Sequence, residues 1–169
     1  MAIASIDRKS VKKVIERLRK ERHPEAVIEL YSTARSALDA AGALGVPVGA
    51  IVKTLVFVID SSPKEIPVVT LIAGDRRCNT EALTSIFNVD GRVRRPDADL
   101  VKEITGFSIG GVSPVALPEG LPLVIDSSLR RFKTIWSSAG HSHCVFGATF
   151  EQLQALTNAP ESNQISEEP

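Results

Sequence analysis

The chain has 169 residues, of which 43% are hydrophobic and 24% charged, a composition typical of a soluble globular protein with one domain. Twenty basic residues balance twenty acidic ones, so no overall positive field favours DNA or a membrane surface as a partner, and any polyanion must meet a local patch. No apolar run approaches the roughly 20 residues of a membrane helix and the N-terminus lacks a secretory apolar segment, so we expect a cytoplasmic protein.

The N-terminal segment, residues 1–24, is predicted to contain an amphipathic helix over residues 7–22. Apolar residues recur there at helical spacing, at Val11, Val14, Ile15 and Leu18. Basic residues crowd the remaining surface, at Lys12, Lys13, Arg17, Arg19 and Lys20. Such a face is either simply solvated or in contact with phosphates, which are bound electrostatically.

A short strand is predicted at 27–31, followed by an alanine-rich helix. Ser32 and Thr33 are candidate caps for the start of this helix, and Gly45 is a plausible stop.

The stretch IVKTLVFVID, residues 51–60, is predicted to be a buried strand that contains a lysine. Because side chains alternate between the two faces of a strand, Lys53 shares one face with Ile51, Leu55, Phe57 and Ile59. Either the lysine reaches water at the strand end, with its stem covering apolar surface, or it faces a ligand.

The stretch at 65–75 is predicted to return as the second strand of a hairpin, because residues 61–64 are turn-forming. Helices follow at 79–87 and 97–107 with a strand at 91–95 between them, and a last helix is predicted at 149–157. The tail, 159–169, lacks apolar periodicity and is predicted to be disordered. Strands and helices interleave without a regular βαβ rhythm, which favours a single α+β domain with a mixed central sheet and peripheral helices.

The loop GFSIGGVSP, residues 106–114, is the second candidate for a functional element. Gly110 and Gly111 allow a ligand to approach the main chain closely, and Pro114 fixes the exit of the loop. Successive N–H groups there could bind an anion or a carbonyl oxygen. A β-bulge or a tight turn is the competing structural explanation. The phosphate-binding patterns GxGxxG and GxxxxGK[ST] are missing.

The sequence contains no GxSxG elbow, no HExxH motif and no carboxylate pair at helical spacing. His141, His143 and Cys144 could begin a metal site, but the fourth ligand and the usual spacing are missing, so we expect neither a metal nor another cofactor. His143 is more plausible as a polar pocket residue, and a surface histidine is the alternative. Cys78 and Cys144 form no CxxC pair and are expected to be free thiols.

Five stretches taken in order resemble the YbaK family, the stand-alone relatives of the editing domain inserted in bacterial prolyl-tRNA synthetases. They are ALGVPVGAIVKTLVF, GDRR, TGFSIGGVSPVAL, LPLVIDSSL and TIWSSAGHSHCVF. The resemblance covers residues 25–158. Its specific parts are the strand lysine and the glycine loop in G-x-x-x-P form, in this order and at this separation.

The resemblance implies a single mixed α+β domain that hydrolyses the ester of mischarged aminoacyl-tRNA. It identifies Lys53 with the functional lysine of the family, and Gly110 and Pro114 with the loop that encloses the aminoacyl group beside the terminal adenosine. Gly111 would supply a backbone donor of this loop, and Asp75 would support the site. The remaining expected substrate contacts are Thr54, Val112, Ser113 and His143.

We therefore expect a trans-acting deacylase that clears a small wrong amino acid, such as cysteine, alanine or serine, from tRNA for proline, with prolyl-tRNA synthetase as the associated partner. Residues 143–145 lack the aspartate of cysteine-clearing relatives, and Thr54 stands where alanine-clearing relatives have asparagine. Sequence alone thus leaves the amino acid open. The alternative is a binding module that holds an aminoacyl-tRNA end or a nucleotide in the same cleft without turnover.

Overall fold

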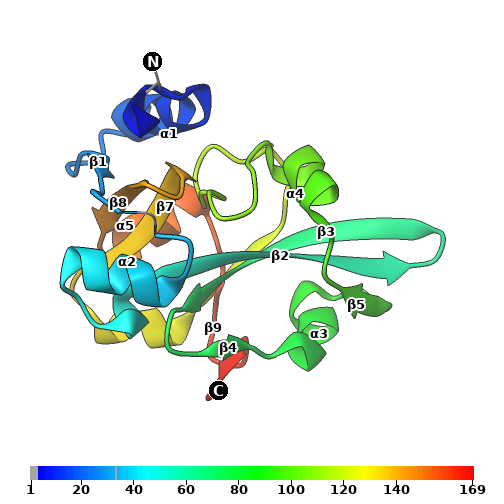
Figure 1. Cartoon of the computed structure of the whole chain (residues 1–169). Coiled ribbons are helices and arrows are strands. Elements are labelled where there is room, and N and C mark those ends of the chain that lie inside the picture. Colours follow the sequence, from blue (N-terminus) through cyan, green and yellow to red (C-terminus); the bar gives the residue numbers. More distant parts are fainter. Residues whose placement is uncertain (1–3, 33) are drawn as a thin grey trace.

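A long antiparallel hairpin forms the centre of the fold and extends well beyond its neighbours (Figure 1). Its strands are β2 (Val52–Ser61) and β3 (Lys64–Ala73), which pair along their whole length from Val52 opposite Ala73 to Ser61 opposite Lys64. The computed structural model describes residues 4–32 and 34–169. The predicted hairpin is confirmed, and the β-rich flanks of residues 61–64 explain it.

The hairpin belongs to a mixed five-stranded sheet with the order β5-β2-β3-β6-β9. The outer strands are β5 (Arg92–Arg94), β6 (Leu123–Asp126) and β9 (Glu161–Ser162). β5 runs antiparallel to β2, whereas β6 and β9 continue the sheet in parallel from β3. The mixed sheet confirms the α+β class expected from the interleaved elements.

A second, antiparallel sheet has the order β1-β8-β7 and lies beside the base of the hairpin. It consists of β1 (Ile28–Glu29), β7 (Ile135–His141) and β8 (Cys144–Ala148). An isolated bridge between Ile51 and Trp136 connects this sheet to the start of β2. β4 (Arg77–Cys78) and β10 (Ser166–Glu167) form a separate short pair.

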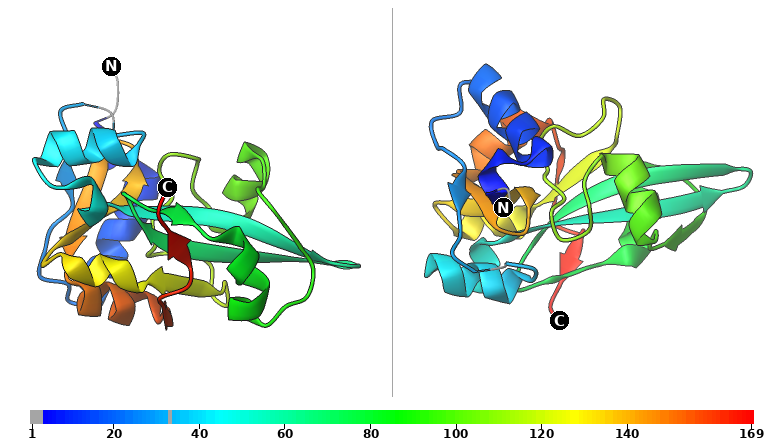
Figure 2. Two further views of the ribbon diagram at one scale, coloured as in Figure 1. Left: turned by 90° about the horizontal axis from the view of Figure 1, so that it is seen from below. Right: turned by 45° about the horizontal axis from the view of Figure 1, so that its top comes forward.

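The helices surround these sheets (Figure 2). They are α1 (Lys9–Lys20), α2 (Ala37–Leu44), α3 (Leu83–Phe87), α4 (Ala98–Thr105) and α5 (Phe150–Thr157), with 3-10 turns at η1 (Ser5–Asp7), η2 (Val48–Ala50), η3 (Thr80–Ala82) and η4 (Ser127–Arg131). Within the described residues, no helix has both the length and the apolar character needed to cross a membrane.

Helix α2 begins later than predicted. Its cap is Ser36, whose hydroxyl accepts a hydrogen bond from the amide of Asp39 at 3.1 Å. Ser32 therefore does not cap it, and Thr33 lies outside the described residues. Several hydroxyl residues lie close together in this stretch of the sequence. Because the helix begins at Ala37, Ser36 directly precedes it and its hydroxyl can accept from an amide of the first turn. The predicted stop is confirmed, since Gly45 follows the helix with a φ of 68°.

The two faces of β2 pack into different parts of the core. Val52 and Val56 belong to a large cluster that also contains Val11, Val14 and Leu18 of α1. Phe57 and Ile59 belong to a second cluster, on the face that also carries Lys53. The alternation argument thus assigned these faces correctly. Because α1 shares the main core, the N-terminal helix is packed into the domain.

The C-terminal residues differ from the expectation of a disordered tail. Residues 161–162 form β9 beside β6, and residues 166–167 form β10 beside β4. Ile165 is fully buried in the second core cluster. One buried isoleucine and main-chain pairing hold this segment in place. Because each strand has only two residues, it leaves no periodic pattern in the sequence, and the prediction from periodicity missed it.

Candidate active site

A cavity of about 410 Å³ lies along the open edge of β2. β3 pairs with one side of this strand throughout, but β5 pairs with the other side only from Val58 to Asp60. At the other end, Ile51 bridges to Trp136. Consecutive residues from Ile51 to Val56 line the cavity between these two contacts. The gap in strand pairing therefore creates the space.

Five other segments complete the walls of the cavity. They are the start of α2 with the residues before it, Arg95 after β5, Val101 of α4, the glycine loop, and the β7–β8 hairpin with Trp136, Ser137, Ser138 and His141. Among the predicted site residues, the structure brings together Lys53, Thr54, Gly110 and Val112 around this cavity. Lys53 and the glycine loop, about 57 positions apart in sequence, thus belong to one site, as expected if both act on one ligand.

Lys53 is half-buried, and its ammonium donates a hydrogen bond to the main-chain carbonyl of Arg76. Burial lowers the pKa of Lys53 from its ordinary value of 10.5, because desolvation disfavours the charged form. The negative charges of Asp75 and, less strongly, Asp126 oppose this shift and raise the pKa. Lys53 is therefore a positioned donor whose charge is less screened than that of a surface lysine.

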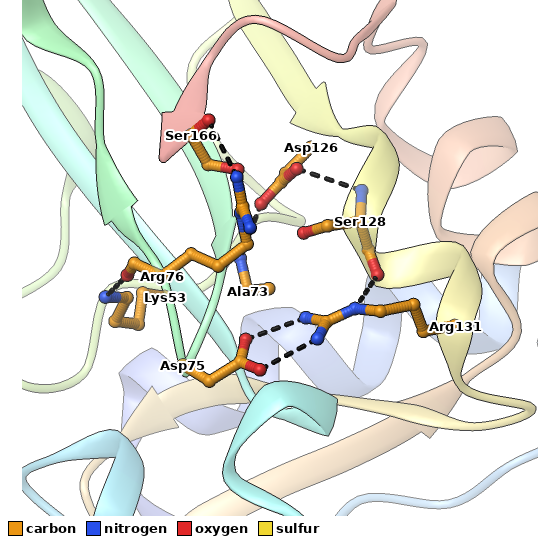
Figure 3. A network of polar contacts seen from close by, with 8 residues as sticks. All are labelled: Lys53, Ala73, Asp75, Arg76, Asp126, Ser128, Arg131 and Ser166. Carbon is orange, nitrogen blue, oxygen red and sulfur yellow. Dashed lines mark hydrogen bonds and ion pairs between the residues drawn. The ribbon is translucent and has the colours of Figure 1, made fainter. Parts of the chain in front are cut away.

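The carbonyl that holds Lys53 is itself fixed by the C-terminal segment (Figure 3). The Arg76 guanidinium donates to the Ser166 hydroxyl at 2.7 Å and to the Ser166 carbonyl at 3.1 Å. Beside this pair, buried Asp126 accepts hydrogen bonds from the amides of Ala73 at 3.1 Å and Ser128 at 2.9 Å. The segment predicted to be disordered thus supports the candidate functional lysine.

Asp75 does not line the cavity. Its carboxylate accepts two hydrogen bonds from the Arg131 guanidinium, at 2.8 and 2.7 Å, which ties the end of β3 to η4. Hydrogen bonding to Arg131 lowers the pKa of Asp75 below its ordinary value of 3.8. Asp75 therefore acts on Lys53 through its charge. The supporting role that the sequence assigned to it stays a prediction.

The glycine loop turns from the surface into the protein between Gly110 and Gly111. Gly110 is exposed and has a φ of 88°, a left-handed conformation that favours glycine. Gly111 lies so close to β7 that an added Cβ would be 3.0 Å from the Cα of His141. Its amide already donates to the Ser108 carbonyl at 2.9 Å, which removes it from the expected set of backbone donors.

Ser113 and Pro114 are buried behind the loop and do not line the cavity. The Ser113 hydroxyl accepts a hydrogen bond from the Val115 amide at 3.2 Å. These two residues hold the loop in place, whereas the sequence had suggested that they contact the substrate.

Of the two histidines, the structure places His141 in the cavity wall, and His143 is not part of that wall. The pair flanks the turn between β7 and β8, with ring centroids 5.4 Å apart. The amide of His143 donates to Nδ1 of His141 at 3.1 Å. Burial lowers the pKa of His141 below its ordinary value of 6.5, so the ring is neutral at pH 7 and carries its proton on Nε2. No group of three or more His, Cys, Asp or Glu side chains in the described residues is placed to hold a metal ion.

Sequence reasoning missed Ser137. Its side chain is buried on β7, lines the cavity, and like that of Thr54 has no hydrogen-bond partner among the described residues. Both hydroxyl oxygens are thus buried and unpartnered, on residues that line the cavity. A signal was present in the sequence, because Ile135, Ser137 and Ala139 alternate along the strand, so the serine occupies an inward position.

Comparisons with known proteins identify the family of the chain. The chain is 33% identical to the crystal structure of a candidate trans-editing enzyme for prolyl-tRNA synthetase, with a TM-score of 0.83 over 94% of this chain and 98% of that one. It is 27% identical to the uncharacterized protein YwhH of Bacillus subtilis (strain 168), over 78% of this chain and 80% of that protein.

The chain is also 30% identical to the proline–tRNA ligase of Lactobacillus helveticus (strain DPC 4571), over 75% of its own length. It matches only 22% of the ligase, so the similarity concerns one part of that larger enzyme. The family model of the aminoacyl-tRNA editing domain matches residues 32–156, which include the strand lysine, the glycine loop and the cavity-lining part of β7. The chain therefore belongs to the aminoacyl-tRNA editing domain family.

Proposed function

We propose that this protein is a trans-acting deacylase that hydrolyses the ester of mischarged aminoacyl-tRNA. The observation that carries the proposal is the meeting of Lys53 and the glycine loop around one cavity, on a chain of the editing family. An aminoacyl ester is already activated, so its hydrolysis needs a positioned water and donors for the developing oxyanion but no protein nucleophile. The site offers such donors.

In the reaction, a water oxygen adds to the ester carbonyl carbon, and the carbonyl oxygen becomes an oxyanion. Collapse of this intermediate breaks the bond to the ribose oxygen, which takes the proton given up by the water, and the free amino acid leaves. Lys53 lines the cavity and its ammonium is a partly desolvated cation, suited to stabilise the oxyanion or to hold the carbonyl. Amides beside Gly111 in the loop would add further donors.

The proton of the attacking water needs an acceptor. His141 lines the cavity, but its Nδ1 already accepts the His143 amide and its Nε2 carries the proton in the neutral ring. It can therefore donate a hydrogen bond to the substrate but cannot serve as the general base in this arrangement. The free hydroxyl of the terminal ribose of the tRNA is the remaining candidate for this role.

The proposed substrate is tRNA for proline that carries a small wrong amino acid, with cysteine, alanine and serine as the candidates. Similarity to proline–tRNA ligases and to the trans-editing structure supports the choice of tRNA and of prolyl-tRNA synthetase as the associated partner, at work in the cytoplasm. The apolar side chains of Val56 and Val101 and the hydroxyls of Thr54 and Ser137 would surround the aminoacyl group.

Deacylation assays with purified protein test this proposal. Proline tRNA charged with alanine, cysteine or serine should lose at least one of these amino acids rapidly. Lys53→Ala should lower kcat by about 10²-fold or more, the usual effect of removing an electrostatic donor from a transition state. Lys64→Ala, which removes an exposed lysine from the far end of the same hairpin, is the matched control and should keep wild-type activity.

The binding-module alternative predicts saturable, salt-dependent tRNA binding without loss of the ester. Failure of the protein to cleave any of the three charged tRNAs, or full activity of Lys53→Ala, would contradict the deacylase mechanism.

A further inference from the structure

A second, larger hollow adjoins the candidate active site. Its volume is about 1010 Å³, and it shares five lining residues with the first cavity, namely Arg35, Ile109, Gly110, His141 and Ser142. We call this whole hollow the basic groove; its other lining residues are Asp7, Arg8, Lys9, Ser10, Lys12, Lys102, Ser108, Gly111 and Gly140. The two spaces are adjacent and share part of their walls.

The groove is strongly positive, although the protein as a whole is neutral. Its basic side chains are Arg8, Lys9, Lys12, Arg35 and Lys102, against a single carboxylate, Asp7. All five are exposed, and none forms an ion pair or a side-chain hydrogen bond within the described part of the chain. By contrast, Arg94, Arg130 and Arg131 elsewhere on the surface are paired with carboxylates. Unpaired basic residues are thus gathered beside the site.

The wall of the groove is shaped by close main-chain contacts. Gly140 has a φ of 100°, and an added Cβ would collide with the Ser10 carbonyl oxygen at the start of α1. Gly111 is similarly close to the main chain of β7. Helix α1, the glycine loop and the end of β7 therefore meet through close main-chain contacts, which fix the wall of the groove. Figure 2 shows α1 beside this loop.

Only one end of α1 contributes to this surface. Lys13 donates to the Gly106 carbonyl at 3.3 Å and lies 3.9 Å above the Phe107 ring, so it packs the helix against the loop. Arg17 pairs with Glu21 on the helix itself. The sequence suggested that the whole basic face could meet phosphates, whereas the structure restricts the groove to Lys9, Lys12 and the preceding Arg8.

We propose that the basic groove binds the phosphate backbone of the tRNA acceptor arm and directs its 3′ end into the cavity. This inference rests on the proposed function. The charge fits a polyanion, and the position directly beside the cavity fits a polyanion whose end carries the scissile ester. A small free anion would need neither the size of the groove nor its position beside the cavity. Phosphate contacts position a nucleic acid without reading its sequence, so the groove would place the acceptor arm while the cavity selects the amino acid.

The test compares Lys12→Gln/Lys102→Gln with the control Lys20→Gln/Lys64→Gln, which removes the same charge from exposed lysines outside the groove. One substrate is full-length charged tRNA, and the other is the aminoacyl ester of adenosine, which has no phosphate. The affinity for tRNA falls as salt rises from 50 to 200 mM. If Lys12→Gln/Lys102→Gln, the groove variant, loses two phosphate contacts, the factor by which its affinity falls should be about tenfold smaller than that of wild type. Its KM for tRNA at low salt should rise, whereas turnover of the adenosine ester should match wild type.

The inference is overturned if the groove variant has the salt dependence and KM of wild type, if the control variant changes equally, or if turnover of the adenosine ester falls in parallel. Binding of uncharged tRNA to the same variants tests the groove even if no ester is hydrolysed. The proposed function can thus fail while the groove is supported, and the groove can fail while deacylation is observed.

Discussion

At the scale of single residues, the behaviour of Lys53 is set by two opposing effects. Burial lowers its pKa, and the charge of Asp75 is the largest influence that raises it. Because Asp75 is held by Arg131 outside the cavity, it can act on Lys53 without contacting the substrate. Asp75 is therefore a positioning residue, and its removal should change how the activity depends on pH.

Asp75→Asn should move the alkaline loss of activity to lower pH. In the wild type, the Lys53 ammonium is present below its pKa and is lost as the pH rises through that value, which lies below 10.5. Removing the negative charge of Asp75 lowers this pKa further, so the variant loses the ammonium earlier on the pH scale. The measurement is kcat/KM against pH, with spontaneous ester hydrolysis subtracted.

Asp60→Asn is the matched control for this variant. Asp60 pairs with Arg94 at 2.8 Å and with similar exposure, on the hairpin away from the cavity. Both variants lose an exposed ion pair worth about 1 kcal/mol or less, so their stabilities should fall by similar small amounts. An unchanged alkaline limb in Asp75→Asn, or an equal shift in Asp60→Asn, would refute the coupling to Lys53.

At the scale of elements, the C-terminal strands link the main chain around the site to the core. Ile165 anchors the segment in the second cluster, and Ser166 then binds Arg76, whose carbonyl holds Lys53 (Figure 3). Two short strands that are remote in sequence thus fix the position of a side chain on the central hairpin. Precise placement of a reacting group matters because small displacements reduce the rate.

Ser166→Ala should lower kcat with little change in KM or in the melting temperature. The variant loses the hydroxyl that accepts a hydrogen bond from Arg76. Such a bond is worth about 1 kcal/mol. If its whole effect is to place Lys53, its loss should lower the rate by about fivefold. Ser166→Thr, which keeps a hydroxyl, should restore most of the activity. Steady-state kinetics and thermal unfolding separate the two effects.

Ser162→Ala, in the same segment, is the control, since among the described residues the Ser162 hydroxyl accepts the amide of Gln164 at 3.1 Å and does not bond to Arg76. Wild-type kcat in Ser166→Ala, or an equal loss in Ser162→Ala, would show that this segment has no positioning role.

The sequence predicted the elements with strong local patterns. The alternation at residues 51–60 identified the central strand and the face of Lys53, and helical spacing identified α1. The C-terminal strands escaped because main-chain pairing over two residues leaves no pattern in side chains. The place of His141 in the cavity wall could not be predicted, because the pairing of β7 with β8 is irregular between Ser138 and His141, and that geometry depends on tertiary contacts. The inward position of Ser137 did follow from the alternation along the strand, but that alternation does not show that a cavity lies beside it.

At the scale of the whole molecule, the packing of α1 shows whether this helix is a separate segment or part of the folding unit that contains the hairpin. Val11 and Val14 are fully buried in the cluster that contains Val56 of the hairpin. A helix that completes the main core cannot unfold without exposing the hairpin to water. We therefore expect a single cooperative transition for the chain, with α1 and the cavity unfolding together.

Val14→Ala should lower the free energy of unfolding by about 2 kcal/mol, through the lost methyl groups and the void they leave in a site that is fully buried. Trp136, the single tryptophan of the chain, lines the cavity and reports on it by fluorescence, whereas circular dichroism reports on the helices. Denaturant unfolding followed by both signals should give coincident curves that shift together. Leu38→Ala, at a site 71% exposed, should shift neither. A circular dichroism transition that moves without the fluorescence would mean that α1 is an independent unit attached to a domain that is stable without it.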